Sequence, residues 1–338
     1  AEPVVVDLTR LPVGDGNYST TGPAVGSVWK CNPPNADAGG AQVEGPWFNG
    51  DGTFDLTAKA VVDGAVTWPH EFTIALEGNT RVLTGNGLPD HTTGTYPVSA
   101  ADDAYQFDRN PNTISAQTVR FELPANPAPA AQAGCIFGMV GVTLSGVTVF
   151  DALDAPGRDA VAHETQDNCQ GHPERTGQYH YHDISTCLTA DDTGGAHSPL
   201  VGYAFDGFGL YGHFGQNGAT ITNADLDECH GHTHEVSWDG NSVEIYHYHA
   251  TWEYPYTVGC FRGMSLEPSP GDGDGAPQGQ PTAPGQGQGP DLAAAAAQLG
   301  ITETQLRDAL GPPPPDLAAA AGRLGLTEAQ LRAALGVP

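Results

Sequence analysis

Two segments of the sequence carry the same histidine-rich pattern. One spans residues 169–187 and the other residues 229–260. Each contains, in the same order, Cys-x-Gly-His, then Tyr-His-Tyr-His, then a final Cys. Chance duplication of such a specific string is improbable, so we infer an internal duplication, or two halves that converged on one task.

The spacing of these histidines is suited to metal binding. Side chains two residues apart on a β-strand point to the same face, so both imidazoles of Tyr179–His182 leave one side of the strand and both phenols the other. Two imidazoles placed in this way can chelate one ion, while the tyrosines pack behind and rigidify them. Tyr246–His249 repeats the arrangement, and His172 and His232 add a loop histidine to each half.

These histidines allow two arrangements. One is a pair of three-histidine sites, each with an open coordination position that favours catalysis. The other is a single site built from the two His-x-His pairs (His180, His182, His247 and His249), with the remaining histidines around it. Neighbouring residues could add ligands, a general base or carboxylates that accept an imidazole N–H; these are His163, Glu164, Asp183, Asp206, Asp227, Glu228, His230 and His234.

The types of ligand limit which metals can be expected. Imidazole suits zinc, copper, iron and nickel, and without thiolate or clear carboxylate ligands copper and zinc lead. The adjacent tyrosines and an oxidising compartment favour copper, with zinc as the alternative. Calcium prefers oxygen ligands, and its usual loop pattern is absent. For a lone histidine an ordinary polar role would be the better interpretation, but the matched duplication favours ligands.

Six cysteines indicate disulfide bonds. An even count in a lysine-poor chain without any Cys-x-x-Cys pair is more typical of disulfides than of thiolate ligands. We favour Cys169–Cys187, because both bound the same histidine-rich loop, and the remaining pairs could be Cys31–Cys135 and Cys229–Cys260. The chain begins Ala1-Glu2-Pro3, as expected after removal of a signal peptide. A secreted or periplasmic protein is therefore expected.

Composition excludes several classes of function. The 40 acidic residues outnumber the 12 basic ones, for a net charge of -28. No cationic surface is therefore expected that could neutralise nucleic-acid phosphates or bind an anionic membrane. No apolar run is long enough for a transmembrane helix. A serine hydrolase has no support, because no Gly-x-Ser-x-Gly elbow is present.

The elements that must position the histidines are expected to be strands. Residues 1–130 contain short apolar runs between turn signals, and residues 131–264 keep this β pattern with long loops. Within them, residues 140–150 predict one or two buried strands and residues 124–133 a Pro/Ala-rich loop. We expect one mainly β domain with a sandwich- or barrel-like core and long disulfide-bonded loops.

The C-terminal part differs in composition. Residues 265–290 consist almost entirely of Pro, Gly, Gln, Ser and Asp, which predicts a flexible linker. Residues 291–338 contain two repeats with a period of 25 residues. Each repeat predicts an alanine-rich helix that ends at glycine, followed by a short helix that opens with a Thr-x-x-Gln capping box. Two helical hairpins are therefore expected, as a docking module for a protein or surface partner, or as a passive tail.

At these motifs the sequence resembles the bacterial YHYH-domain proteins, over roughly residues 80–264. Further matching strings lie at residues 86–91, 160–164, 167–172, 197–207, 226–232 and 259–263. One departure is His230, where asparagine would be expected. The resemblance implies an exported bacterial protein and places His91, His163, His197 and Asp206 in the motif set, as possible neighbours of the same site. It implies no settled activity.

The sequence leaves three hypotheses for the function open. The first is an extracellular copper-binding protein that acts as a redox metalloenzyme on a small molecule. The second is a zinc-dependent hydrolase, in which Glu164 or Asp206 serves as the base. The third is a non-enzymatic binding or surface module, in which metal and disulfides stabilise a loop-rich β scaffold.

Overall fold

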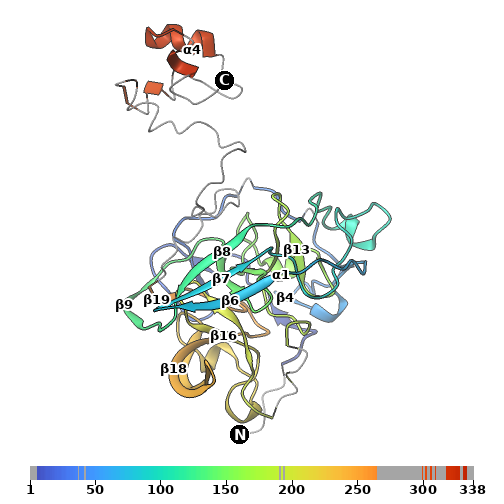
Figure 1. The fold of residues 1–338 in the computed structure, drawn as a ribbon. Helices are drawn as coiled ribbons and strands as arrows, with labels where there is room; N and C mark the ends of the chain where they lie inside the picture. The colour runs from blue at the N-terminus through green and yellow to red at the C-terminus, as the bar shows by residue number, and fades with distance from the viewer. Residues whose placement is uncertain are drawn as a thin grey trace. The chain divides into compact units, whose positions relative to one another are not determined.

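The fold is seen in a computed structural model of the chain (Figure 1). It describes residues 6–264 except 37, 42, 190, 191, 193 and 194, and in the C-terminal part residues 299, 301, 302, 305, 306, 309, 317–327 and 330–332. The chain divides into two compact units, Ala1–Gln280 and Pro281–Pro338. The expected linker, residues 265–290, lies outside the described residues.

An eight-stranded mixed sheet forms the centre of the first unit. Its strands lie in the order β13-β14-β11-β10-β15-β16-β18-β17. Their bounds are β10 Met139–Thr143, β11 Thr148–Phe150, β13 Gly171–Pro173, β14 Tyr179–Tyr181, β15 Leu200–Ala204, β16 Gly209–Tyr211, β17 Gly231–Trp238 and β18 Asn241–His249. The two Tyr-His-Tyr-His segments thus lie on strands of one sheet, except for His182, which directly follows β14.

The strand order of this sheet is the same when read outward from its centre in either direction. β10 pairs antiparallel with β15 at the middle, and each of them forms a hairpin with the next strand, β11 or β16. These strands pair in parallel with β14 and β18, which pair antiparallel with the outermost strands β13 and β17. Two equivalent four-stranded halves therefore build the sheet, which supports the duplication inferred from the sequence.

The N-terminal residues form short strands around this sheet. They are β1 Leu11–Pro12, β2 Tyr18–Ser19, β3 Val28–Trp29, β4 Thr53–Phe54, β5 Val61–Val62, β6 Phe72–Glu77, β7 Thr80–Gly85 and β8 Val119–Pro124. β6, β7 and β8 make a three-stranded antiparallel sheet, and β5 pairs with β12, Gln166–Asp167. Helical turns are short: η1 Leu56–Ala58, η2 Asp103–Gln106, α1 Ala160–His163, η3 Gln216–Gly218 and η4 Asn223–Asp225. The mainly β prediction is confirmed.

The prediction of a loop at residues 124–133 is wrong for most of this segment. Pro129–Gly134 forms strand β9, which pairs antiparallel with β19, Phe261–Gly263. Five of its six residues are Pro, Ala or Gly, which have low strand propensity. The tertiary partner at the end of the unit overrides that local preference.

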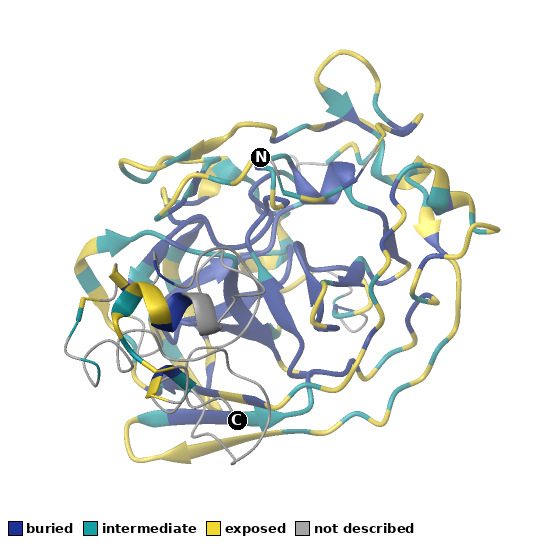
Figure 2. Cartoon of the chain, turned by 90° about the horizontal axis from the view of Figure 1, so that it is seen from above, coloured by how far each residue is buried: buried dark blue, intermediate teal, exposed yellow. Residues whose placement is uncertain are grey.

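A single large apolar cluster joins the N-terminal part to the central sheet. It includes Trp47 and Phe54 from the N-terminal part, Val142 and Tyr248 from the sheet, and Phe205 directly after β15, all of them buried. Figure 2 shows the buried segments gathered in the interior. Residues 6–130 and 131–264 therefore share one core. The disulfides are Cys31–Cys135, Cys169–Cys187 and Cys229–Cys260, which is the pairing favoured from the sequence.

The described part of the second unit matches the expected local motifs. α4 spans Leu317–Leu324, and Gly325 follows it with φ +69°, the left-handed conformation that favours glycine after a helix. Thr327 and Gln330 exchange the two hydrogen bonds of a capping box, as do Thr302 and Gln305. Leu306, Ala320, Ala321 and Leu331 form a separate small core. Among the helices described, none is long and apolar enough to cross a membrane.

Removal of residues 265–338 is expected to leave the first unit folded, because the two described cores share no residue. The shortened chain should melt cooperatively within about 2 °C of the full chain, since the large core sets the melting temperature. Circular dichroism on both chains checks this. A broad or lost transition would show that the second unit contributes to the first.

Candidate metal centres

Seven histidines gather in two clusters. The first cluster consists of His172, His180 and His182, and the second of His197, His232, His247 and His249. Within each cluster one nitrogen per imidazole lies within 4.8 Å of the others. The two Tyr-His-Tyr-His segments thus belong to different clusters, so the structure favours two sites over a single site that combines all four of their histidines.

The first cluster is built on the β13–β14 hairpin. His172 on β13 lies opposite His180 on β14, and His182 follows directly after β14. The Nε2 atoms of His180 and His182 are 3.2 Å apart. All three residues are nearly inaccessible to solvent, with exposed fractions of 3–4%.

A carboxylate completes the surroundings of the first cluster. Oε2 of Glu164 lies 3.5 Å from Nε2 of His172 and 3.4 Å from Nε2 of His182. The side chain is 14% exposed, and its Oε2 has no hydrogen-bond partner. Burial, together with the carboxylates of Asp154 and Asp108, raises the pKa of Glu164 well above its usual range. Glu164 therefore lies in contact with the ligand candidates themselves.

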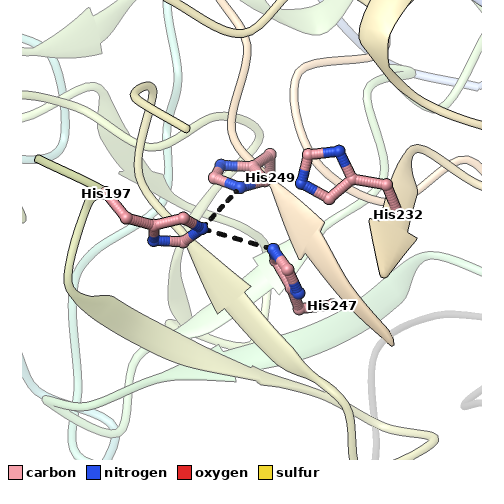
Figure 3. Close-up of side chains that lie close together, drawn as sticks. All are labelled: His197, His232, His247 and His249. Atoms are coloured by element: carbon pink, nitrogen blue, oxygen red, sulfur yellow. Dashed lines mark hydrogen bonds between the residues drawn. The ribbon is translucent and has the colours of Figure 1, made fainter. Parts of the chain in front are cut away.

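The second cluster is built on the equivalent β17–β18 hairpin. His232 on β17 lies opposite His247 on β18, which also carries His249. The fourth member, His197, comes from the segment before β15 and points between two imidazoles, with its Nε2 3.3 Å from Nε2 of His247 and 3.2 Å from that of His249 (Figure 3). His197 and His232 are half-buried, whereas the other two are fully buried.

Backbone carbonyls orient the imidazoles from outside. In the first cluster Nδ1 of His182 donates to the carbonyl of Asp151 (2.5 Å), and in the second Nδ1 of His249 donates to that of Gly212 (2.7 Å). Four more rings do the same with Gln178, Ser198, Asp225 and Ile245. Of the seven Nδ1 atoms only that of His172 lacks a partner. Nε2 of the other six is left facing the cluster centre.

The tyrosines of the motif support the ligand strands from the opposite face. Tyr179 donates to Asp167 (2.8 Å), and its counterpart Tyr246 donates to Asp227 (2.9 Å). Tyr248 donates to Asp206 (2.6 Å), whereas Tyr181 contacts Nε2 of His91 (2.6 Å). The expectation that the phenols rigidify the ligands from behind therefore agrees with their position.

The same tyrosines explain the glycine of the Cys-x-Gly-His motif. A Cβ on Gly171 would lie 2.2 Å from the Tyr179 ring, and one on Gly231 would lie 2.4 Å from the Tyr246 hydroxyl. No side chain fits there without displacing the tyrosine. The residue before each glycine, Gln170 or His230, has φ +59° or +75°. Asparagine tolerates this left-handed conformation well. This gives a physical reason why asparagine would be expected at position 230.

Several residues expected near the site lie elsewhere. The ring of His163 contacts Asp15 (2.9 Å), and that of His230 contacts the Thr251 hydroxyl (3.0 Å). The carboxylates expected to accept imidazole N–H groups are a correction: Asp206 and Asp227 accept the tyrosine hydroxyls, and Asp183 accepts from Gln170. Strand alternation turns the phenols away from the imidazoles, and Asp206 and Asp227 bind these phenols, while backbone carbonyls accept from the imidazoles. The backbone carbonyl of Glu228 lies 3.6 Å from Sγ of Cys260, which is bonded to Cys229.

Two further histidines, His234 and His197, were expected near the site. His234 lies beside His232, with ring centroids 4.1 Å apart, but outside the second cluster. His197 is a full member of that cluster, although it was expected only as a possible neighbour. It belongs to no His-x-His pair, so spacing offered no signal for it as a ligand.

Burial keeps the clustered imidazoles neutral. It lowers the pKa of His182 and His232 to about 4 and that of His247 to about 3. Burial also lowers the pKa values of His172, His180 and His249 well below the usual range, with further lowering by neighbouring histidines. Neutral imidazole is the form that binds metals.

These shifts predict acid lability of the metal-free protein. An unfolded histidine titrates near pH 6.5, so between about pH 6.5 and 4 these clustered histidines bind more protons in the unfolded chain than in the folded one. The contribution of these histidines to the free energy of unfolding therefore has its full value above pH 6.5 and falls as the pH is lowered towards 4. Melting temperatures measured on chelator-treated protein should drop through this window. A His182→Asn variant should show a shallower drop, and an equal slope would contradict the assignment.

The family model described as YHYH protein matches residues 120–223. The match includes the first Tyr-His-Tyr-His segment and ends before the second, so it spans less of the chain than the resemblance at residues 80–264 implies. No curated protein and no solved structure matches the chain. The chain is therefore similar to the YHYH family over residues 120–223.

Proposed function

We propose that the protein binds two transition-metal ions, one in each histidine cluster. The observation that carries this proposal is the orientation of the imidazoles. A carbonyl can only accept, so each Nδ1 that contacts one must carry the proton, and the Nε2 of that ring has a lone pair. Lone pairs that face one another within a buried cluster repel unless a cation lies between them.

The spacing of these nitrogens supports the proposal. Imidazole nitrogens bind zinc at about 2.0–2.1 Å, which in a tetrahedral arrangement separates two ligand nitrogens by about 3.3 Å. The separations of 3.2 Å in the first cluster and of 3.2 and 3.3 Å in the second agree with this value. Nε2 of His172 and of His232 has no hydrogen-bond partner within the described protein, so a metal would also satisfy these two atoms.

Copper is the metal we propose first, with redox chemistry at the first cluster. Imidazole-rich sites suit copper, and the ligands stand beside buried tyrosines in a chain with three disulfides. Four imidazoles can fill the coordination of an ion in the second cluster, which fits a stabilising role. The first cluster has three imidazoles and Glu164, and its ion would be the reactive one.

Zinc-dependent hydrolysis is a second candidate, favoured by the position of Glu164. Its Oε2 lies in contact with two ligand nitrogens, where a carboxylate can accept a proton from a water molecule. In that case Glu164→Gln would abolish activity while the zinc content stayed the same. Loss of the first ion in the same variant would instead identify Glu164 as a ligand.

We also propose that the protein is exported. Disulfides persist in oxidising compartments, and three of them stabilise the first unit, two around the ligand hairpins. A docking role for the repeats at residues 291–338 stays a prediction.

Elemental analysis by mass spectrometry tests the proposed function. The protein should be purified from its host without chelators or an immobilised-metal column. About two transition-metal ions per chain are expected, because each cluster can hold one. Copper would support the redox assignment, and zinc would favour hydrolysis or a structural role. A metal-free protein that takes up neither ion would overturn the proposal.

A further inference from the structure

β17 carries a further His-x-His pair, of which the second cluster uses only one member. His232 and His234 are two residues apart on this strand, so both side chains point to the same face of it. Their ring centroids are 4.1 Å apart, whereas the ring centroid of His234 is 6.2 Å from that of His247. His234 therefore adjoins the second cluster through His232, without lying among its four ligand candidates.

Both members of this pair have a nitrogen atom without a partner. Nε2 of His232 and Nδ1 of His234 are buried and have no hydrogen-bond partner among the described residues. A buried polar atom of this kind needs a physical explanation, and an ion is one of the few that apply. Two imidazoles this close can share one transition-metal ion. We call the pair of His232 and His234 the outer pair.

Burial increases from the outer pair towards the centre of the second cluster. His232 and His234 are half-buried, as is His197, whereas His247 and His249 are fully buried. An ion from solvent therefore meets a half-buried imidazole before it reaches the buried pair. His232 belongs both to the outer pair and to the cluster, where it lies beside His247 and His249 (Figure 3). An ion held by the outer pair is thus already bound to one of its final ligands.

The first half of the sheet has no equivalent of the outer pair. The residue two positions after His172 is Glu174 and not a histidine. Its carboxylate accepts the backbone N–H of Thr176 (2.9 Å) in the turn between β13 and β14. The two hairpins therefore share the ligand strands, but only β17 extends its histidines beyond the cluster. This difference between duplicated halves indicates a task that belongs to the second cluster.

The strand that carries the outer pair also carries negative charge. Glu235 follows His234 and lies directly opposite Glu244 on β18, and both glutamates are exposed. Like charges placed opposite each other destabilise a hairpin, so this pair does not serve stability. Its negative potential raises the concentration of cations near this edge of the sheet.

We infer that the outer pair is the position through which a copper ion enters and leaves the second cluster. The inference rests on the proposed function, because it takes the second cluster as a metal site. The step is a ligand exchange: His247 and His249 replace His234 as ligands, while His232 keeps its bond. The oxidation state of copper stays the same, so the step needs no oxidant or reductant. The second ion is then exchangeable with copper-binding ligands outside the chain.

The rate of copper exchange tests this inference. The parent protein is the full-length His180→Ala variant, which is expected to keep only the second ion. Loaded with Cu(II) and mixed with excess EDTA, it loses copper at a rate that stopped-flow absorbance measures. An added His234→Ala should slow both removal and reloading at least about tenfold, because an adjacent second ligand makes capture intramolecular. The copper content after dialysis should stay at about one ion per chain, because four ligand candidates remain.

A second substitution and a matched control accompany this experiment. His234→Gln keeps a polar side chain and should slow exchange as much as alanine does, with an unchanged melting temperature. His70→Ala removes a half-buried imidazole that contacts the carbonyl of Ser145, outside both clusters, and should exchange at the parent rate. Parent rates in both His234 variants would overturn the inference. Loss of the ion from them would also overturn it, because His234 would then be a permanent ligand. The proposed function fails separately, if the parent binds no copper.

Discussion

The paired substitution of His180→Ala and His247→Ala is expected to abolish metal binding, whereas each single variant loses one of two ions. Each residue is a buried member of a different cluster, and its Nε2 lies within 3.3 Å of another ligand candidate. Loss of one imidazole should weaken binding at its own cluster by about 100-fold or more, because even residues that only orient a ligand can cost up to that factor. Elemental analysis of the three variants after dialysis checks this.

A buried histidine outside the clusters provides the control. His213 stacks on Trp252 with ring centroids 4.0 Å apart and belongs to neither cluster. His213→Ala should keep both ions, although it removes a buried ring. If His213→Ala lost as much metal as His247→Ala, general destabilisation would explain the losses. If the double variant kept both ions, the ligand assignment would be wrong.

Asp206→Ala is expected to cause the largest loss of stability among single substitutions behind the clusters. The fully buried carboxylate accepts the Tyr248 hydroxyl at 2.6 Å and the Gly263 N–H at 2.8 Å. Its removal leaves both donors buried without a charged acceptor, which costs about 3–5 kcal/mol of unfolding free energy. Denaturant unfolding of the metal-free variant measures the loss.

The two halves offer an internal comparison for this effect. Asp206→Asn keeps one acceptor oxygen for Tyr248, so it should cost clearly less than alanine. Because Tyr248 lies between His247 and His249, the second ion should be lost from Asp206→Ala before the first. Preferential loss of the first ion would show that the phenol face does not position the ligands of its own strand.

The strand pattern of the ligands was predictable from the sequence, because it depends only on alternation. His180 and His182 share one face and the tyrosines the other, as period two requires. The pairing of Cys169 with Cys187 could also be predicted, because the two residues flank the same short loop. By contrast, β9 could not be predicted from its Pro/Ala-rich residues, because its partner β19 lies more than a hundred residues later.

The division into two clusters could not be decided from spacing. Whether His180 and His247 share a site depends on the four strands that separate β14 from β18 in the sheet. His197 reaches the second cluster from a segment with no His-x-His pair. The backbone carbonyls that orient the rings, such as that of Gly212, leave no mark in a sequence, because every residue has one. The buried ion pair of Lys30 with Asp151, whose carbonyl accepts from His182, likewise joins residues too far apart in the chain to be predicted.

Anomalous X-ray diffraction would test the central claim most directly. Crystals of protein isolated without chelators would be measured above and below the absorption edges of copper and zinc. We expect two anomalous peaks in each molecule, one among His172, His180, His182 and Glu164, and one among His197, His232, His247 and His249. Absence of both peaks after soaking in copper and zinc salts would contradict the account. The two histidine clusters would then serve packing and hydrogen bonding alone.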